Sequence, residues 1–396
     1  MIASARQRYN QSFSESRYQE FLNDLDRSAG LKISFRVAES PVFIDRHFRK
    51  KLMEASAEVI KLLQTPDVKD ASARAVPDGL SVPNETDHTL FLALDFAVVK
   101  DDLGGFIPQL IELQGFPSLF GWQDFLPNKF REHFAIPDDF QNHFVSQADY
   151  QTILKKAILG NEDPEHVVLL EIDPLKQNTA VDFLITEKMF GVKPVHIGDV
   201  VKEGRKLFYK RGAQRVPIHR IYNRVIFDEL VKRSDLQLSF TLTDEVNVRW
   251  AGHPNWFFKI SKVLMPHLKS RFVPPCYFLS ELTEYPPDLN NYVLKPLYSF
   301  SGSGVVFNVT REDLDAIPVN SRTDFILQRK VQYEPVIQAP DGLVKAEIRL
   351  MFIWEEGKPE PTLVTNLARL SRGEMIGVKY NKDKTWVGGT VCFFEP

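Results

Sequence analysis

Two apolar runs, at residues 89–99 and 107–113, are separated by a polar stretch that contains Gly104 and Gly105, which predicts two strands joined by a turn. Successive side chains of a strand point to opposite faces, so Glu112 and Gln114 are expected to share one face. Asp95, on the neighbouring strand, can join them. Two carboxylates and an amide oxygen are hard ligands of the kind that magnesium prefers. The hairpin is therefore predicted to hold magnesium that carries phosphate groups.

The hydrophobic pattern divides the rest of the chain into segments of different character. Apolar residues at helical spacing predict helices over 14–29 and 45–63, whereas the polar, proline-containing residues 64–88 are predicted to form a loop. Strands alternate with a helix between residues 150 and 250, which predicts a parallel α/β subdomain. Strand patterns dominate from 256 onward. The predicted class is α/β, of the α+β kind, with parts at 1–149, 150–255 and 256–396.

A lysine and a loop of small residues form a second candidate site, far along the chain from the hairpin. Lys295 ends a predicted strand and enters a Ser/Gly loop, where small residues let backbone N–H groups approach phosphates. Such a loop by itself is often only a hairpin turn. The lysine precedes the loop, so this is not a Walker A motif. The small residues of the loop are Ser301, Gly302, Ser303 and Gly304.

Three later segments extend this candidate nucleotide site. Residues 325–331 form an apolar strand that runs into a polar hinge, which is the form an adenine pocket needs. Glu347 and Arg349 share one face of the next predicted strand, although such a pair by itself is more typical of a surface salt bridge. Arg369 is a candidate for a bidentate phosphate or acyl-phosphate contact, and its alternative is a solvated edge residue.

Composition narrows the classes of partner. The 396 residues carry a net charge of −3 and no face-forming basic run, so nucleic acid is not expected as the main partner. Two cysteines are too few for a disulfide framework or a zinc site, which favours a reducing, cytoplasmic location. The N-terminus lacks the apolar core of a signal peptide, and no segment has the length of a membrane span.

Taken together, these segments resemble the ATP-grasp superfamily. The metal-binding strands precede the lysine strands here, which is similar to the circularly permuted branch that includes glutathionylspermidine synthetase and eukaryotic glutathione synthetase. The similarity covers roughly residues 89–120 and 165–396 in pattern. Its most specific segments are the Val-Leu-Lys-Pro strand at 292–296, the adenine hinge at 326–331 and the segment 218–224 that closes the α/β subdomain near the substrate.

The resemblance implies ATP and Mg²⁺ as cofactors, and it implies a role for each matching residue. Lys262, Lys295, Ser301, Gly302, Ser303, Gly304, Gln328, Lys330 and Val331 would contact the nucleotide; Asp95, Glu112 and Gln114 would hold magnesium; Arg349 and Arg369 would bind phosphate and stabilise the transferring group. Asn223 and Arg224 are expected to hold a substrate carboxylate, because arginine suits planar anions.

The expected function is an ATP-dependent ligase that activates a small-molecule or peptide carboxylate as an acyl phosphate, which an amine then attacks. Two residues depart from the family pattern. Gln114 stands where the family usually has Asn, and Ala93 stands where some members have an arginine. Two alternatives therefore remain open at this stage: a catalytically impaired nucleotide-binding sensor or scaffold, and an ATP-grasp phosphotransferase.

Overall fold

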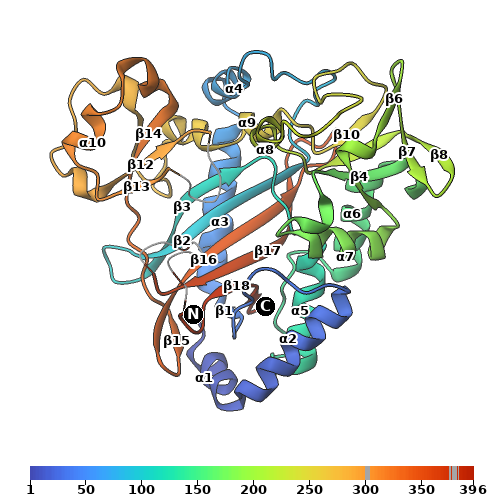
Figure 1. Ribbon diagram of the computed structural model, residues 1–396. Coiled ribbons are helices and arrows are strands. Elements are labelled where there is room, and N and C mark those ends of the chain that lie inside the picture. Colours follow the sequence, from blue (N-terminus) through green and yellow to red (C-terminus); the bar gives the residue numbers. More distant parts are fainter. Residues whose placement is uncertain (299–303, 374–375, 377–380, 382) are drawn as a thin grey trace.

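The centre of the molecule is a six-stranded antiparallel sheet that joins segments from distant parts of the sequence (Figure 1). The computed structural model describes residues 1–298, 304–373, 376, 381 and 383–396. Five strands follow in the order β18-β17-β16-β2-β3, and β15 also pairs with β16. Their bounds are β2 Phe91–Lys100, β3 Phe106–Gln114, β15 Ile337–Ala339, β16 Gly342–Ile353, β17 Thr362–Ser371 and β18 Gly388–Thr390.

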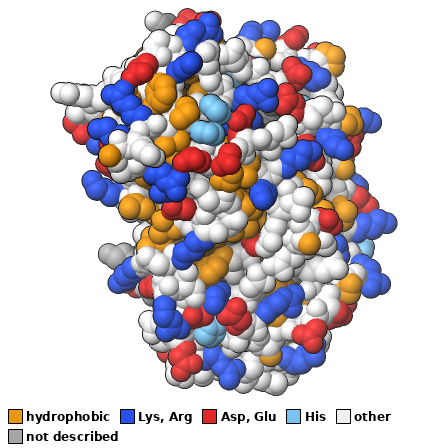
Figure 2. Space-filling model, turned by 90° about the vertical axis from the view of Figure 1, so that its right-hand side faces the viewer, with side chains coloured by type: hydrophobic (Ala, Val, Ile, Leu, Met, Phe, Trp, Pro, Cys, Tyr) orange, Lys and Arg blue, Asp and Glu red, His pale blue; other side chains and the backbone are white. Residues whose placement is uncertain are grey.

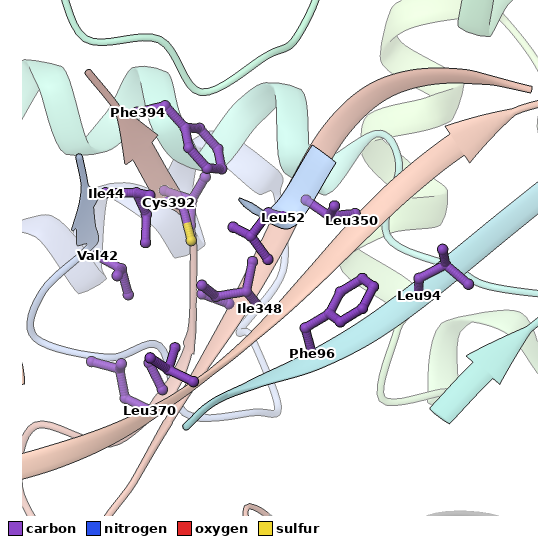
Figure 3. Close-up of a cluster of buried hydrophobic side chains, with 14 of the residues drawn as sticks. Val42, Ile44, Leu52, Leu94, Phe96, Ile348, Leu350, Leu370, Cys392 and Phe394 are labelled. Carbon is purple, nitrogen blue, oxygen red and sulfur yellow. The ribbon is translucent and has the colours of Figure 1, made fainter. Parts of the chain in front are cut away.

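One face of this sheet is apolar and forms the main core (Figure 3). Side chains such as Leu94, Phe96 and Ile348 point from it toward helix α3 (Arg46–Leu63) and toward the parallel pair β1 (Val42–Ile44) and β19 (Cys392–Phe394). Full burial of each such side chain stabilises the fold by about 1.5–3 kcal/mol. The opposite face is divided: Phe91, Met351 and Leu367 pack in a second buried cluster with residues of the parallel sheet, and polar side chains occupy another part.

The two helices predicted near the N-terminus are confirmed, but the loop predicted over 64–88 is partly wrong. Helix α2 spans Glu15–Ala29, and α3 begins at Arg46 after an Asp45 cap. Within the predicted loop lies α4, Pro66–Ala73, which starts with a proline that suits the first helical turn. The hydroxyl of Ser72 donates to the Lys259 carbonyl, so a contact with a distant segment helps to stabilise this helix. The polar sequence of the segment gave no indication of that contact. Helices α1 (Ala3–Ser12) and α5 (Trp122–His133) complete this part.

A second, parallel sheet lies beside the central one (Figure 1). Its order is β10-β9-β4-β5, and all three pairings are parallel. The expectation of an α/β arrangement here is incomplete, because a separate antiparallel sheet, β6-β7-β8, follows β5. Two-residue turns at Gly204 and Gly212, both with positive φ, join its strands. The elements are α6 Gln147–Leu159, β4 Val167–Glu171, α7 Ala180–Phe190, β5 Lys193–His196, β6 Val201–Glu203, β7 Lys206–Arg211, β8 Gln214–Ile218, β9 Arg220–Asn223, α8 Phe227–Lys232 and β10 Arg249–Ala251.

A third, antiparallel sheet with its own small core lies at the other side of the central sheet (Figure 1). Its order is β11-β14-β12-β13. The elements of this part are α9 Trp256–Lys259, the 3₁₀ turn η4 Lys262–His267, β11 Cys276–Phe278, β12 Tyr292–Pro296, β13 Val306–Phe307, α10 Arg311–Asp315 and β14 Phe325–Arg329. Helices and several sheets together make a mixed α/β fold of the α+β kind.

The surface mixes charges of both signs. On the face seen in Figure 2, acidic and basic side chains are interspersed with small apolar areas. Among the residues that the structure describes, no helix combines the length and the apolar character needed to cross a membrane.

Candidate functional site

Charged side chains gather on the polar face of the central sheet, opposite the core. Strand register places Asp95 of β2 directly between Arg349 of β16 and Glu112 of β3. One step along the sheet, Glu347 lies opposite Arg369 of β17. Because side chains alternate between the two faces of a strand, this register puts these five side chains on one surface.

Asp95 lies at the middle of this surface and is 1% exposed. Arg349 donates to its two carboxylate oxygens from Nε at 2.6 Å and from Nη2 at 2.7 Å, and Arg369 donates to one of them at 2.7 Å. Burial by itself would raise the pKa of Asp95, but attraction to Arg349 and Arg369 outweighs burial and lowers it. The carboxylate is therefore ionised and fully engaged by arginines.

Glu347 is a second buried carboxylate in this cluster. Its Oε1 lies 2.5 Å from Arg369 Nη2, and its Oε2 accepts a 2.5 Å hydrogen bond from the hydroxyl of Tyr333. Burial raises the pKa of Glu347 despite the attraction of Arg369. Tyr333 lies two residues after the segment 325–331 that was predicted to form the adenine hinge. Its hydrogen bond ties the chain that follows this segment to the arginine cluster.

Lys295 extends from the third sheet toward the central one. Its Nζ donates to Gln328 Oε1 at 2.7 Å and lies 3.5 Å from the carbonyl oxygen of Ile111. Ile111 is the extra residue of a β-bulge in β3, between the residues paired with Asp95 and Phe96. Burial lowers the pKa of Lys295, and attraction to Glu112 opposes that shift.

Lys262 approaches the same place from η4. Its Nζ donates to the Pro296 carbonyl at 3.0 Å. Burial lowers the pKa of Lys262 to about 8, while Glu112 acts to raise it. Two lysines from one side and Glu112 from the other therefore share one electrostatic environment. Both lysines lie far from Glu112 along the sequence.

The three residues predicted to bind magnesium differ in whether their side-chain oxygens already form hydrogen bonds within the protein. Both oxygens of Asp95 accept hydrogen bonds from arginines. The side chains of Glu112 and Gln114, by contrast, have no hydrogen bond or ion pair with any described residue, and both are half-buried. A magnesium ion that carries phosphates needs only one or two protein ligands, because phosphates and water complete its shell. Glu112 and Gln114 fit that requirement better than Asp95 does.

The remaining nucleotide candidates lie along the third sheet. Gln328 is buried and bound to Lys295. Lys330 donates to Asn308 Oδ1 at 2.7 Å, and Val331 is half-buried directly after it. Gly304 has a φ of 72°, which favours glycine. The rest of the predicted phosphate loop, Ser301, Gly302 and Ser303, lies outside the described residues.

The two predicted substrate residues lie at the carboxyl end of β9. The Asn223 side chain is buried and bonds the backbone of Val225 at 3.2 Å. Arg224 donates to the carbonyls of Pro117 at 2.9 Å and Phe116 at 3.4 Å, and its buried Nε has no partner among the described residues. Arg224 therefore fastens the segment after β3 to the parallel sheet. Its role toward a substrate carboxylate stays a prediction.

Two groups of site residues were not among the predicted ones. Glu347 was noticed only as the neighbour of Arg349, and Tyr333 gave no signal because its partner lies on another strand. The second group lines a cavity of about 350 Å³ that adjoins Arg349 and Arg369. Phe35, Leu119, Trp122, Gln123, Leu367 and Val387 are among its lining residues. They come from distant segments, so no sequence motif marks them.

Comparison with known proteins supports the fold. No protein-family model matches this chain, and no curated protein sequence does. Among solved structures, the chain is similar to a glutathione synthetase-like effector, GSS30, from Globodera pallida, in its apo form. The TM-score is 0.59 and the identity 10%, over 96% of both chains. The chain shares the fold of this glutathione synthetase-like protein.

Proposed function

We propose that this protein is an ATP- and magnesium-dependent carboxylate–amine ligase with a circularly permuted ATP-grasp arrangement. The reaction would form an amide or peptide bond through an acyl phosphate. The shared fold with a glutathione synthetase-like protein supports the class of enzyme, although the low identity extends only to the fold. The support for the chemistry comes from the site itself.

The observation that carries the proposal is that Lys295 and Lys262 both lie in the electrostatic field of Glu112, with Lys295 Nζ 3.5 Å from the carbonyl of the neighbouring Ile111. A triphosphate bound there would lie near Lys295 of the third sheet, Lys262 of η4 and a metal-binding carboxylate of the central sheet. Gln328 accepts a hydrogen bond from Lys295, and Lys330 and Val331 follow the end of the same strand, β14; these three residues would line the base pocket. Phosphoryl transfer depends mainly on such positioning and charge neutralisation.

Glu112 and Gln114 would hold the magnesium ion. When bound, the ion would neutralise phosphate charge and orient the terminal phosphoryl group. We assign Asp95 a different task. It would hold Arg349 and Arg369 in place, because its oxygens already accept their hydrogen bonds.

Arg349 and Arg369 would act on the transferring group. An oxygen of the substrate carboxylate attacks the terminal phosphorus, the bond from that phosphorus to the bridging oxygen breaks, and ADP leaves. The amine nitrogen then attacks the acyl carbon, phosphate leaves with its bonding electrons, and the nitrogen gives up a proton. Both steps concentrate negative charge on phosphoryl oxygens, where guanidinium groups stabilise it.

ATP titration by calorimetry, with and without magnesium, tests the proposal. The wild type should bind ATP more tightly with magnesium, and Lys295→Ala should lose that binding. Lys210→Ala is a matched control, because Lys210 is an exposed lysine on β7, in a different sheet. If the wild type binds no ATP under either condition, the ligase proposal fails.

Product analysis then separates the proposal from its alternatives. ADP release that depends on both a carboxylate and an amine, with an amide as product, supports a ligase. A phosphorylated acceptor without an amide indicates a phosphotransferase. ATP binding without turnover of any carboxylate and amine pair indicates a sensor or scaffold. The longer side chain of Gln114, where the family has Asn, favours this alternative.

A further inference from the structure

The small sheet β6-β7-β8 is far more basic than the rest of the chain. Residues 202–215, which form most of it, carry six lysines and arginines and one acidic residue, whereas the whole chain has a net charge of −3. Figure 2 looks onto this side of the molecule, and in its upper part basic and histidine side chains border a small apolar area. A local excess of one sign of charge attracts partners of the opposite sign.

The central strand of this sheet places two lysines on either side of an aromatic ring. The inner face of the sheet is buried and includes Leu207 and Tyr209 of β7. Side chains alternate along a strand, so Lys206, Phe208 and Lys210 lie on the outer face. Phe208 is half-buried, and both lysines are exposed. Because β7 lies between β6 and β8, this row runs along the middle of the outer face.

The neighbouring strands add an apolar centre and a further cation to the outer face. Val201 of β6 and Pro217 of β8 are both paired with Phe208. Arg215 of β8 lies directly opposite Lys210. Like charges directly opposite each other in a sheet are destabilising. An acidic group placed between Lys210 and Arg215 would reduce their repulsion.

Few of these cations are firmly held by acidic groups of the chain itself. Lys206 and Lys210 form no ion pair with any residue that the structure describes, whereas Lys202 pairs with Asp244 at 2.6 Å. Exposed ion pairs contribute only about 0–1 kcal/mol each, so their members readily exchange partners. Three pairs of this kind, with side chains that are 43–65% exposed, are Arg205–Glu245, Arg211–Glu165 and Arg215–Glu203.

A polar cavity of about 400 Å³ adjoins the outer face at the turn between β6 and β7. Its polar lining residues are Asn84, Glu162, Arg205, His219, Asn247 and Arg249. Glu162 is paired with His219 at 3.1 Å, but the guanidinium of Arg249 has no hydrogen bond or ion pair with any described residue. Arg205 directly precedes Lys206, so the cavity lies next to the first lysine of the outer face. A segment bound on the face would place a carboxylate beside Arg249.

The geometry of the sheet favours a partner in extended conformation on the outer face. The sheet is not suited to adding a strand at β8, because this edge strand contains Pro217, which has no N–H. Lys206 and Lys210 are about 13 Å apart along β7, since a strand rises about 3.3 Å per residue. An extended peptide has the same repeat. Carboxylates four residues apart in it would face the two lysines, and the residue midway would face Phe208.

One acidic residue within the face distinguishes between classes of anionic partner. Glu203 lies opposite Lys206. Lipid headgroups and nucleic acids present phosphates at close spacing, about one charge per 1.7 Å along duplex DNA, so some of these phosphates would meet Glu203. A protein segment can place an uncharged residue there. The face therefore fits an acidic peptide better than a membrane or a nucleic acid.

We propose that the outer face of β6-β7-β8 and the adjoining cavity bind an acidic segment of a partner protein. The segment would be extended, with an apolar residue midway between two carboxylates that lie four residues apart. The inference does not depend on the proposed ligase function, because this sheet and the third sheet lie on opposite sides of the molecule (Figure 1).

A labelled peptide tests the inference by fluorescence anisotropy. The probe is a fluorescein-labelled, amidated nonapeptide that repeats glutamate, serine, leucine and serine and ends in glutamate. The control peptide has the same composition, but its three glutamates are adjacent and cannot reach both lysines. The wild type should bind the probe about tenfold more tightly than the control peptide. Added salt should weaken the binding, because the contacts are between exposed charges.

Variants assign the binding to the outer face. Lys206→Gln combined with Lys210→Gln should weaken binding of the probe about tenfold. Lys61→Gln combined with Lys69→Gln removes the same charge from exposed positions of α3 and α4 and should keep the wild-type affinity. The wild type should prefer the probe to a peptide with serine in place of both leucines, and Phe208→Ala should lose this preference.

Equal affinity of the wild type for the probe and the control peptide would overturn the inference, because charge alone would then explain the binding. Absence of binding at millimolar peptide would also overturn it, as would unchanged binding in the Lys206 and Lys210 double variant. Binding to phosphatidylserine vesicles or to oligothymidylate in place of the peptide would overturn it in favour of a membrane or a nucleic acid. These assays contain no ATP, so their failure is separate from a failure of the nucleotide titration.

Discussion

Asp95 accepts two hydrogen bonds, at 2.6 and 2.7 Å, from the guanidinium of Arg349, which lies 254 residues later in the chain. The two residues face each other across β2 and β16 and are both buried. A buried ion pair of this geometry is costly to break from one side, because the other charge is left without compensation. The ion pair therefore affects both the stability of the central sheet and the positions of Arg349 and Arg369.

Asp95→Asn should destabilise the protein by about 3–5 kcal/mol, the range for removing one member of a buried pair. The physical reason is that Arg349 would keep its charge in a buried position. Urea unfolding followed by circular dichroism measures the change. Glu203→Gln is the control, since Glu203 pairs with Arg215 on the surface and both are more than half exposed. The control should change stability by less than about 1 kcal/mol, and an equally small effect of Asp95→Asn would show that Asp95 carries no such role.

Glu112→Gln should retain ATP binding in the absence of magnesium but lose the gain that magnesium provides, and turnover should vanish with it. The substitution removes the charge of a hard ligand and leaves the shape nearly unchanged. Calorimetry at several magnesium concentrations measures this loss. Gln114→Asn, which shortens the second ligand to the family's residue, should keep the magnesium dependence. Unchanged magnesium dependence in Glu112→Gln would remove Glu112 from the metal site.

ATP affinity should fall as the pH rises through about 8. The pKa of Lys262 is lowered to about 8 by burial, so its charge is present below that pH and is lost above it. The dissociation constant for ATP should therefore increase between about pH 7.5 and 9, the range over which Lys262 loses its proton. Lys262→Met should bind ATP weakly with a flatter pH profile. An identical profile in wild type and variant would assign the titration to another group.

Glu171→Gln should stabilise the protein at pH 9 and change it little at pH 5. Burial raises the pKa of Glu171 from 4.5 to about 8, with Arg224 acting in the opposite direction. Between these values the folded state holds a proton that the unfolded state has released. Wild-type stability therefore falls as pH rises through this window, by at most about 1.4 kcal/mol per pH unit. Melting curves of both proteins at the two pH values test this, and parallel shifts would contradict it.

Part of the site followed from the sequence because it depends on local pattern. Two apolar runs on either side of a polar turn identify the hairpin, and the two-residue period of a strand puts Glu112 and Gln114 on one face. The same reasoning pairs Glu347 with Arg349 on β16. Strand periodicity sets which side chains share a face, and that property needs no knowledge of the partner strand.

The rest depends on contacts that no local pattern encodes. Periodicity does not indicate that β16 lies beside β2, so the engagement of Asp95 by two arginines was not foreseen. The bulge at Ile111, which turns a carbonyl toward Lys295, arises only when two strands are in register. The partner of Tyr333 and the cavity lined by Gln123 are likewise results of tertiary packing.

The place of β2 between β3 and β16 has a consequence for biosynthesis. The hairpin β2–β3 leaves the ribosome early, but its second neighbour is not made until residues 342–353 have been added. During that interval β2 has one open edge and an apolar face, which are the features that let nascent chains pair with each other. The yield of native protein should therefore depend on how well this hairpin is shielded until residues 342–353 have been made.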